Sequence, residues 1–419
     1  MTKSCKIAVN QLQVGNFIQL PLSWKDHPFL FSRFKIKQQA QIELIKNLGV
    51  QHVLVLLDRS DTHVLPPEEA NKGTNLLSES KLEQLSEELK QQKSDSIEAQ
   101  KRLKRQLKKT EQEFDRSISM LRSLMAKLRN RPLNAVDEGK ELIHDICEQL
   151  LKSDKLVLHL MPDSKNDEGI NFHSLNVSVL SMLIAKELKW TRSEVELVGI
   201  GALFHDIGKL KVPTQLLNKT SALTEAEQKF FDQHPAMGVA LLKLADNFPS
   251  DALPIILNHH EFLDGSGTPK GLKEPQLDKL SQLVGAVNTF DNLCHSDRSR
   301  KSKTPYTALG MLYKNYQNQL NSAFVNRIIK LLGIYPPGSI VELSTGQYGM
   351  VMSVNVGQLL FPTTLVYDPL VPKEQAPIID LAHEGISIIR CLPPSALPEK
   401  VLQYLNPREK MNYYFSTDG

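Results

Sequence analysis

The most informative stretch of this 419-residue chain is Ile200–Lys209, which reads IGALFHDIGK. Its first five residues are small or apolar, which favours a buried helix that ends near Phe204. His205 and Asp206 follow directly in the same apolar run. Charged side chains are almost never buried unless they pair with another charge or bind a metal. This pair is therefore a candidate metal site.

Helical patterns continue on both sides of this stretch, from about residue 137 to residue 333. Apolar residues recur there in successive segments, with a spacing typical of helices and with short breaks between them. The segments predicted as helices include 175–188, 193–204, 225–234, 236–244 and 280–291. The pattern predicts an all-helical domain over residues 133–335.

Further potential metal ligands lie in this helical region. Three of the histidines adjoin another ligand-type residue directly, in His205-Asp206 and in His259-His260-Glu261. Imidazole and carboxylate ligands together suit zinc, iron or manganese. Six or seven such groups exceed what one tetrahedral ion needs, and they fit two ions that share a bridging carboxylate. The groups are His173, His205, Asp206, His234, His259, His260 and Asp291.

The other histidines stand alone in the sequence. Because an isolated histidine is most simply a surface or cap residue, we expect that role for His27, His52, His63, His144, His159, His295 and His383.

The flanking regions differ in pattern from the helical domain. Residues 1–70 combine short strands with a helix near 38–48, which predicts a small α+β module. Residues 71–132 are rich in Lys, Glu and Gln, and their leucines recur every three or four residues, which predicts a long amphipathic helix. Residues 336–419 contain strand-like runs separated by Gly and Pro, which predicts a small β appendage. The predicted fold class is mostly α.

Composition excludes several classes of protein. With 50 Lys and Arg against 47 Asp and Glu, the net charge of +3 is too small for a duplex nucleic-acid binder. No run of about 18 apolar residues predicts a membrane span, and no signal peptide is recognisable at the start. We therefore expect a cytoplasmic protein. Its four cysteines form no CxxC pair, which predicts reduced thiols.

The order His173, His205-Asp206 and Asp291 resembles the signature of the HD phosphohydrolase superfamily. The finer pattern resembles the HD-GYP branch of this superfamily, the bacterial cyclic di-GMP phosphodiesterases. The resemblance covers about residues 171–332, and the region before it resembles the small domain often found ahead of HD-GYP domains. The matching stretches, in order, are 173–177, 205–213, 217–219, 223–227, 234–235, 259–261 and 264–269.

The resemblance implies metal-dependent hydrolysis of cyclic di-GMP to pGpG, GMP or both. It implies that the seven groups named above are the metal ligands, with Asp206 as the bridge, and that iron is the favoured metal. Lys209 matches a family lysine that contacts the phosphate and has a catalytic role. The residues implied to bind substrate are Lys209, Asp264, Gly265, Gly267, Arg298, Arg300 and Lys301. A solvated basic loop is an equal interpretation of the last three.

Two departures from the family pattern keep alternatives open. The Gly-Tyr-Pro of the family reads Gly267-Thr268-Pro269 here, and Gly169 stands where some members place a glutamate that supports a third metal. A catalytically slow cyclic di-GMP receptor, and an HD phosphohydrolase acting on another nucleotide, are the alternative functions. The 76–131 helix suggests a homodimer, and GGDEF-type signalling proteins are further candidate partners.

Overall fold

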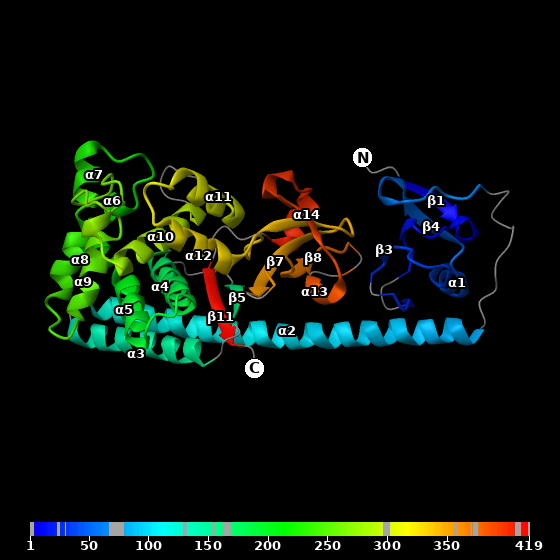
Figure 1. Cartoon of the computed structure of the whole chain (residues 1–419), viewed down its shortest axis with the longest axis horizontal. Helices are drawn as coiled ribbons and strands as arrows, with labels where there is room; N and C mark the ends of the chain where they lie inside the picture. The colour runs from blue at the N-terminus through cyan, green and yellow to red at the C-terminus, as the bar shows by residue number, and fades with distance from the viewer. Residues whose placement is uncertain are drawn as a thin grey trace. The chain divides into compact units, whose positions relative to one another are not determined.

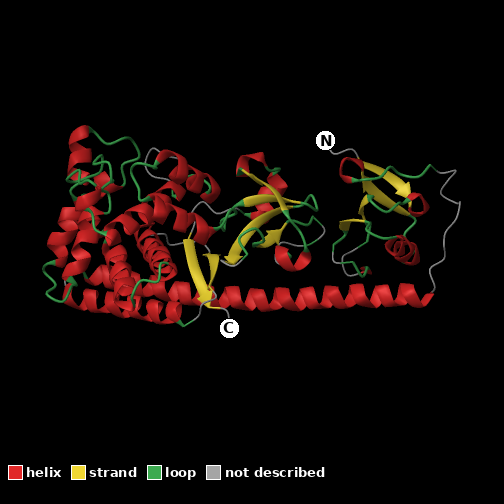
Figure 2. Cartoon of the chain, viewed as in Figure 1, coloured by secondary structure: helices red, strands yellow, loops and turns green. Residues whose placement is uncertain are grey.

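The computed structural model describes most of the chain, in the ranges 4–22, 26–29, 31–66, 79–128, 132–152, 156–161, 169–295, 302–355, 358–369, 371, 376–406 and 412–417. The chain divides into two compact units. One contains residues 1–105 with 343–348 and 366–379, and the other contains 106–342, 349–365 and 380–419. Figure 1 colours the elements from blue at the N-terminus to red at the C-terminus, and Figure 2 shows that most of the regular structure is helical.

A four-stranded sheet and one helix form the N-terminal module. The strands are β1 (Ser4–Ala8), β2 (Phe17–Gln19), β3 (Arg33–Lys35) and β4 (His52–Leu56), and the helix is α1 (Gln39–Asn47). The sheet order is β1-β4-β2-β3, and its assigned pairings are antiparallel. Alternate residues of β4, Val53 and Val55, are buried, as expected for a strand with one face on a core. The predicted α+β module is confirmed.

The long helix α2 (Glu79–Lys127) is uninterrupted over 49 residues. Near its start, Leu82, Leu85 and Leu89 pack against the core of the N-terminal module. Further along, one apolar stripe is buried in the second unit, and it includes Phe114 and Leu121. The predicted apolar stripe therefore packs against other parts of the chain, with its first leucines partly buried and Phe114 and Leu121 buried.

Helices make up most of the region that was predicted to be all-helical, with one strand as the exception. Its elements, in order, are α3 (Pro132–Leu151), α4 (Gly169–Glu187), α5 (Arg192–Phe204), the short 3-10 helix η4 (Ile207–Lys211), α6 (Thr214–Leu217), α7 (Glu225–Phe231), α8 (His234–Leu242), α9 (Leu253–Asn258), α10 (Lys279–Cys294), α11 (Pro305–Asn315) and α12 (Ser322–Leu332). Helix α4 packs against α5 and α10, and α8 packs against η4 and α9. This packing assembles the candidate site.

The strands of the C-terminal region join a strand from within the helical domain. These strands are β6 (Ile340–Leu343), β7 (Tyr348–Asn355), β8 (Thr363–Val366), β9 (Ile378–Asp380), β10 (Ile388–Leu392) and β11 (Asn412–Thr417), with the short helices α13 (Leu381–Glu384) and α14 (Glu399–Leu405) between them. The sheet order is β10-β6-β7-β5-β11, where β5 is Leu156–Met161. The β appendage is therefore not a separate sheet.

Strand β5 was not predicted from the sequence. Its residues read LVLHLM, a short apolar run that a strand and a buried helix share, so periodicity does not separate the two. The pairing of β5 with β7 and β11, which are distant in sequence, decides for the strand. No helix in the described part of the chain is long and apolar enough to cross a membrane.

Candidate metal site

His205 and Asp206 stand where helix α5 ends and η4 begins. Thr191 caps the start of α5, its hydroxyl accepting from the backbone N–H of Glu194, and a continuous run from Val198 to Phe204 is buried. His205 follows as the last residue of the helical turn, and both His205 and Asp206 are at most 2% exposed. The apolar run thus carries a histidine and a carboxylate into the protein interior.

A glycine contact brings η4 against helix α8. A Cβ placed on Gly208 would lie 1.8 Å from the backbone oxygen of His234 and 2.6 Å from the backbone nitrogen of Gly238. Only a residue without a side chain allows two backbones to approach so closely. Because Gly208 is two residues from Asp206, this contact sets Asp206 beside His234.

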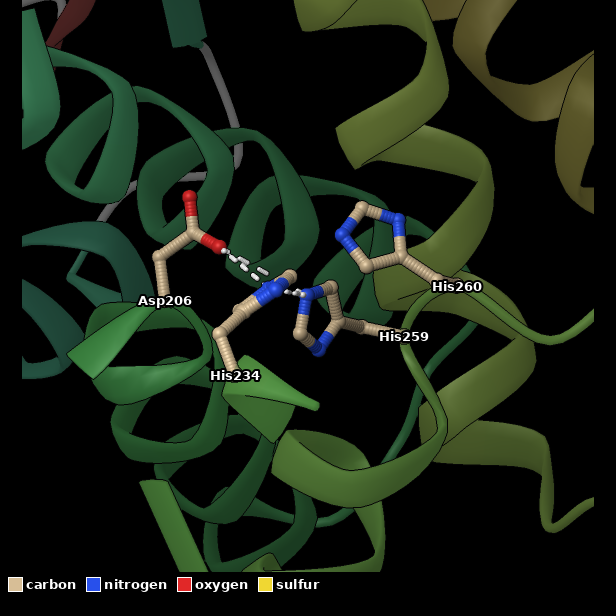
Figure 3. A group of neighbouring side chains, drawn as sticks. All are labelled: Asp206, His234, His259 and His260. Atoms are coloured by element: carbon tan, nitrogen blue, oxygen red, sulfur yellow. Dashed lines mark hydrogen bonds and ion pairs between the residues drawn. The ribbon is translucent and has the colours of Figure 1, made fainter. Parts of the chain in front are cut away.

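One group of potential ligands contains Asp206, His234, His259 and His260 (Figure 3). One potential ligand atom from each lies within 4.8 Å of the others. The Oδ1 atom of Asp206 is 3.2 Å from Nε2 of His234 and 3.6 Å from Nε2 of His259. His260 is partly buried, with its ring centroid 4.1 Å from that of His259.

A second group contains His173, His205 and Asp206, so the two groups share one carboxylate. The Oδ2 atom of Asp206 lies 3.4 Å from Nε2 of His173 and 3.5 Å from Nε2 of His205. The two imidazole Nε2 atoms are 3.1 Å apart. Asp206 therefore presents one oxygen to each group, as a carboxylate that bridges two ions must.

Backbone carbonyls fix the orientation of three of these imidazoles. Nδ1 of His205 lies 2.6 Å from the oxygen of Ala202, Nδ1 of His234 lies 2.8 Å from that of Phe231, and Nδ1 of His259 lies 2.8 Å from that of Ile256. A carbonyl can only accept, so each Nδ1 donates and each Nε2 keeps a lone pair aimed at Asp206. Metal-binding histidines are typically held in this way.

The donor set fits a bound cation. Asp206 Oδ1 is buried and has no hydrogen-bond donor among the described residues, although imidazole nitrogens face it. Burial lowers the pKa of His205, His259 and His260, so protons on these rings do not supply the missing positive charge. Lone pairs that converge on a carboxylate repel one another unless a cation lies between them. The residues present therefore fit divalent metal ions.

Asp291 reaches the site through His173 rather than through either group. Its Oδ2 atom lies 2.5 Å from Nδ1 of His173 and 3.1 Å from Nδ1 of His295, and Nδ2 of Asn176 donates to its Oδ1. Burial by itself raises the pKa of Asp291. The facing His295 and His173 lower it by more than burial raises it, so the carboxyl pKa lies below its usual range. Its role as a metal ligand remains a prediction.

Lys209 lies at the edge of the site and pairs with Asp206. Its ammonium is 2.5 Å from Oδ2 of Asp206 and 5.8 Å from the ring centroid of Phe231. Burial by itself raises the pKa of Asp206. Lys209 and the facing imidazoles lower it by more than burial raises it, so its pKa is well below the usual range. The Lys209 side chain is partly exposed, which leaves it accessible from outside the site.

The glycine-rich loop 264–269 is held against the ligand-bearing residues. Glu261 is buried, and its carboxylate accepts from the backbone N–H of Lys270 at 2.6 Å and of Leu272 at 2.9 Å. The backbone N–H of Thr268 donates to the carbonyl of His260, and a Cβ on Gly267 would lie 2.4 Å from Cα of Glu261. This position requires glycine, and Gly265 adopts a positive φ of 82°.

Several predicted site residues have a different standing. The Asp264 carboxylate accepts from the backbone and hydroxyl of Ser266, so it stabilises its own loop. The three basic residues Arg298, Arg300 and Lys301 lie outside the described residues. Sequence reasoning missed Asn176 and Glu261 as supports of the site, because an amide or carboxylate that holds a neighbour carries no spacing signal.

Two of the histidines expected to be surface or cap residues are neither, because His27 and His159 are buried. The prediction was wrong for these two, whose rings are covered by contacts with other segments: Ser32 lies beside His27, and Ser416 of β11 lies beside His159. His295 is mostly buried beside Asp291, but it is the C-cap residue of α10, as predicted.

Comparisons with known proteins agree with this geometry. A domain of unknown function, DUF3391, matches residues 4–138, and an HD domain matches residues 140–323. A cyclic di-GMP phosphodiesterase of Pseudomonas aeruginosa is 26% identical over 385 residues, which cover 91% of this chain and 89% of that protein.

Two shorter matches fall on about a third of the chain. A cyclic di-GMP phosphodiesterase response regulator of Xanthomonas campestris is 32% identical over 148 residues, which are 35% of this chain and 39% of the regulator. A 3'3'-cGAMP-specific phosphodiesterase of Vibrio cholerae is 29% identical over 164 residues, which are 39% of this chain and 35% of that enzyme. The chain therefore carries a DUF3391 domain ahead of an HD domain, an arrangement that it combines with similarity to proteins named as cyclic dinucleotide phosphodiesterases.

Proposed function

We propose that this chain is a metal-dependent phosphodiesterase that hydrolyses cyclic di-GMP to pGpG, GMP or both. One observation carries the proposal: two groups of buried imidazoles converge on the two oxygens of a single carboxylate, Asp206. The match over nine-tenths of the chain to a protein named as a cyclic di-GMP phosphodiesterase supports the substrate.

The proposed cofactor is a pair of divalent ions, held by the two groups that share Asp206. Iron is favoured by the family resemblance, and manganese or zinc suits the same imidazole and carboxylate donors. When bound, such ions polarise phosphoryl oxygens and lower the pKa of water. Asp291 completes the proposed ligand set of His173, His205, Asp206, His234, His259, His260 and Asp291.

The protein residues supply orientation and positive charge. The carbonyls behind His205, His234 and His259 hold three imidazoles ready, so little reorganisation is needed when the site is filled. Lys209 places an ammonium beside Asp206, in a position to stabilise negative charge on a substrate phosphate. The loop of Asp264, Gly265 and Gly267 is proposed as the substrate lip, with Arg298, Arg300 and Lys301 as further phosphate contacts.

A second candidate substrate is another cyclic dinucleotide. The Vibrio cholerae relative named as 3'3'-cGAMP-specific supports this candidate, because its match covers a similar share of the chain to that of the Xanthomonas campestris regulator. A receptor that binds cyclic di-GMP without rapid turnover is the third candidate, motivated by Thr268 at the position of the family tyrosine.

The decisive experiment measures turnover of purified, metal-loaded chain with cyclic di-GMP and, separately, with 3'3'-cGAMP. Wild type is compared with a His205→Ala/Asp206→Ala double variant, and products are separated by chromatography. Cyclic di-GMP hydrolysis that the double variant lacks supports the proposal. Faster hydrolysis of 3'3'-cGAMP moves the assignment to the second substrate, and tight binding without turnover moves it to the receptor.

The proposed partners beyond substrate have weaker support. A homodimer through the 76–131 helix remains a proposal, although Leu82, Leu85 and Leu89 are already partly buried against the N-terminal module. GGDEF-type signalling partners and a cytoplasmic location also remain proposals.

A further inference from the structure

The last strand of the chain is tied to the candidate site by one side chain, Asn176. This residue lies on α4, one turn after His173, and it is 2% exposed. Its Oδ1 atom accepts from the backbone N–H of Tyr413 at 2.9 Å, and its Nδ2 donates to Oδ1 of Asp291. The side chain therefore bridges the backbone of β11 to a carboxylate that holds His173.

The geometry of β11 explains why its backbone can reach Asn176. Strand β11 pairs with β5 over residues 412–417 and stands at the edge of the sheet. In an antiparallel pair, alternate residues direct N–H and C=O away from the partner strand, and at an edge these groups need other partners. The N–H of Tyr413 finds its partner in Asn176, so this edge is satisfied by the helix that carries His173.

The contacts around Tyr413 fix the strand in this register. Tyr413, Tyr414 and Phe415 are all buried. The Tyr413 hydroxyl donates to the carbonyl of Pro337, and the Tyr414 hydroxyl lies 3.2 Å from Oγ of Ser117 on α2. Anchors on both sides of the strand hold the Tyr413 N–H in place.

Asp291 depends on this bridge because its two oxygens have different partners. Oδ2 faces His173 and His295, whereas Oδ1 accepts from the Asn176 amide. A carboxylate held at both oxygens cannot rotate, and its contact with Nδ1 of His173 directs Nε2 of that ring towards His205 and Asp206. Removal of such outer contacts typically weakens metal binding 10- to 100-fold.

We propose that Asn176 is a positioning residue for the metal site, and that strand β11 is the part of the chain that holds Asn176. The inference rests on the proposed function, because it assumes that His173, His205 and Asp206 bind an ion. It adds a dependence of that ion on residues 412–417, where Tyr413 lies 237 positions after Asn176 in sequence.

The first test compares three variants on α4 in the full chain. Asn176→Ala removes both hydrogen bonds, and Asn176→Asp keeps an acceptor for Tyr413 but loses the donor to Asp291. Ser181→Ala is the control, because Ser181 is a buried polar residue of the same helix whose hydroxyl bonds to none of the residues that the structure describes. Metal-free protein is titrated with Mn²⁺, and the two dissociation constants are measured by calorimetry.

We expect Asn176→Ala and Asn176→Asp to weaken one Mn²⁺ site at least tenfold and leave the other within about twofold. Ser181→Ala is expected to match wild type. If Asn176→Asp binds both ions as wild type does, the bridge to Asp291 has no role and the inference is overturned. If wild type itself binds no Mn²⁺, both the proposed function and this inference fail. Failure of the inference alone is therefore distinguishable from failure of the proposed function.

The second test removes only the backbone donor. Tyr413→Pro lacks the N–H that reaches Asn176, and Tyr413→Ala removes the same aromatic side chain but keeps the N–H. Proline is tolerated on an edge strand where the N–H points away from the sheet. We expect weaker Mn²⁺ binding in Tyr413→Pro than in Tyr413→Ala, by at least fivefold. Equal affinities in the two variants would overturn the role of β11.

Discussion

At the scale of single residues, Asp206 is the centre of the site. One oxygen faces His234 and His259, the other faces His173, His205 and Lys209, and the residue is 2% exposed. The sequence predicted this residue and its histidine partners, because an acid inside an apolar run has few explanations other than pairing or metal binding.

The charge of Lys209 can be tested separately from metal binding. We expect Lys209→Ala to lower kcat by about 10²-fold, because it removes a preorganised cation beside the reacting phosphate. Lys211→Ala, an exposed lysine on the same short helix, is the control and should keep its activity. Steady-state kinetics with metal content measured in parallel checks this. Unchanged kcat in Lys209→Ala would contradict the assigned role.

A second residue, His27, predicts a pH dependence of stability in the N-terminal module. Burial, and then the nearby Lys93, lower the pKa of His27 from 6.5 to about 4. The unfolded chain therefore binds more protons than the folded chain between about pH 4 and 6.5. The free energy of unfolding consequently rises with pH through this window, by on the order of 3 kcal/mol. This contribution of His27 is lost again as the pH falls from 6.5 to about 4.

Amide hydrogen exchange of strand β4, corrected for its intrinsic pH dependence, measures this local stability. Protection should fall between pH 6.5 and 4 in wild type, and the slope should flatten in His27→Asn. His63→Asn, which changes an exposed histidine of the same module, should keep the wild-type slope. An identical slope in all three proteins would show that His27 is not the group responsible.

At the scale of elements, the approach of η4 to α8 determines where Asp206 lies. Gly208 is the point of contact, and a Cβ there would overlap the backbone oxygen of His234. We expect Gly208→Ala to lower the free energy of unfolding of the helical domain by about 1–3 kcal/mol, and to weaken metal binding as the two elements separate.

Gly310→Ala is the matched control for this change. Gly310 lies inside helix α11, and nothing stands within 4 Å of a Cβ added there. The same substitution should therefore be neutral or stabilise by up to about 1 kcal/mol, because alanine is the better helix former. Chemical denaturation of both variants with metal titration decides. Equal stability of the two variants would mean that the η4–α8 contact is not tight.

The elements also show what the sequence can predict. Helices α4, α5, α7, α8 and α10 each overlap a segment whose apolar spacing predicted it, although four of them extend beyond the predicted bounds. Strand β5 and the bridge from Asn176 to Tyr413 were not predictable in the same way, because both depend on partners that are distant in sequence, in residues 353–355 and 412–417. Local periodicity carries no record of such partners.

At the scale of the whole molecule, metal binding should act on one unit and not on the other. The ligands all belong to the unit that contains residues 106–342. A ligand that binds the folded state at 100 times its dissociation constant stabilises it by about 2.7 kcal/mol. Chelation should therefore increase amide exchange in α4 and α5 and leave strands β1 and β4 unchanged. An equal increase in both units would contradict this independence.

The central proposal is a site in which two ions share one carboxylate, that of Asp206. The test is the metal content of the purified chain after saturation with Mn²⁺ or Fe²⁺ and removal of free ion, measured for wild type, His173→Ala, His260→Ala and Asp206→Ala. With a shared carboxylate, we expect two ions in wild type, one in each histidine variant and none in Asp206→Ala. A single ion in wild type, or one ion retained by Asp206→Ala, would contradict it.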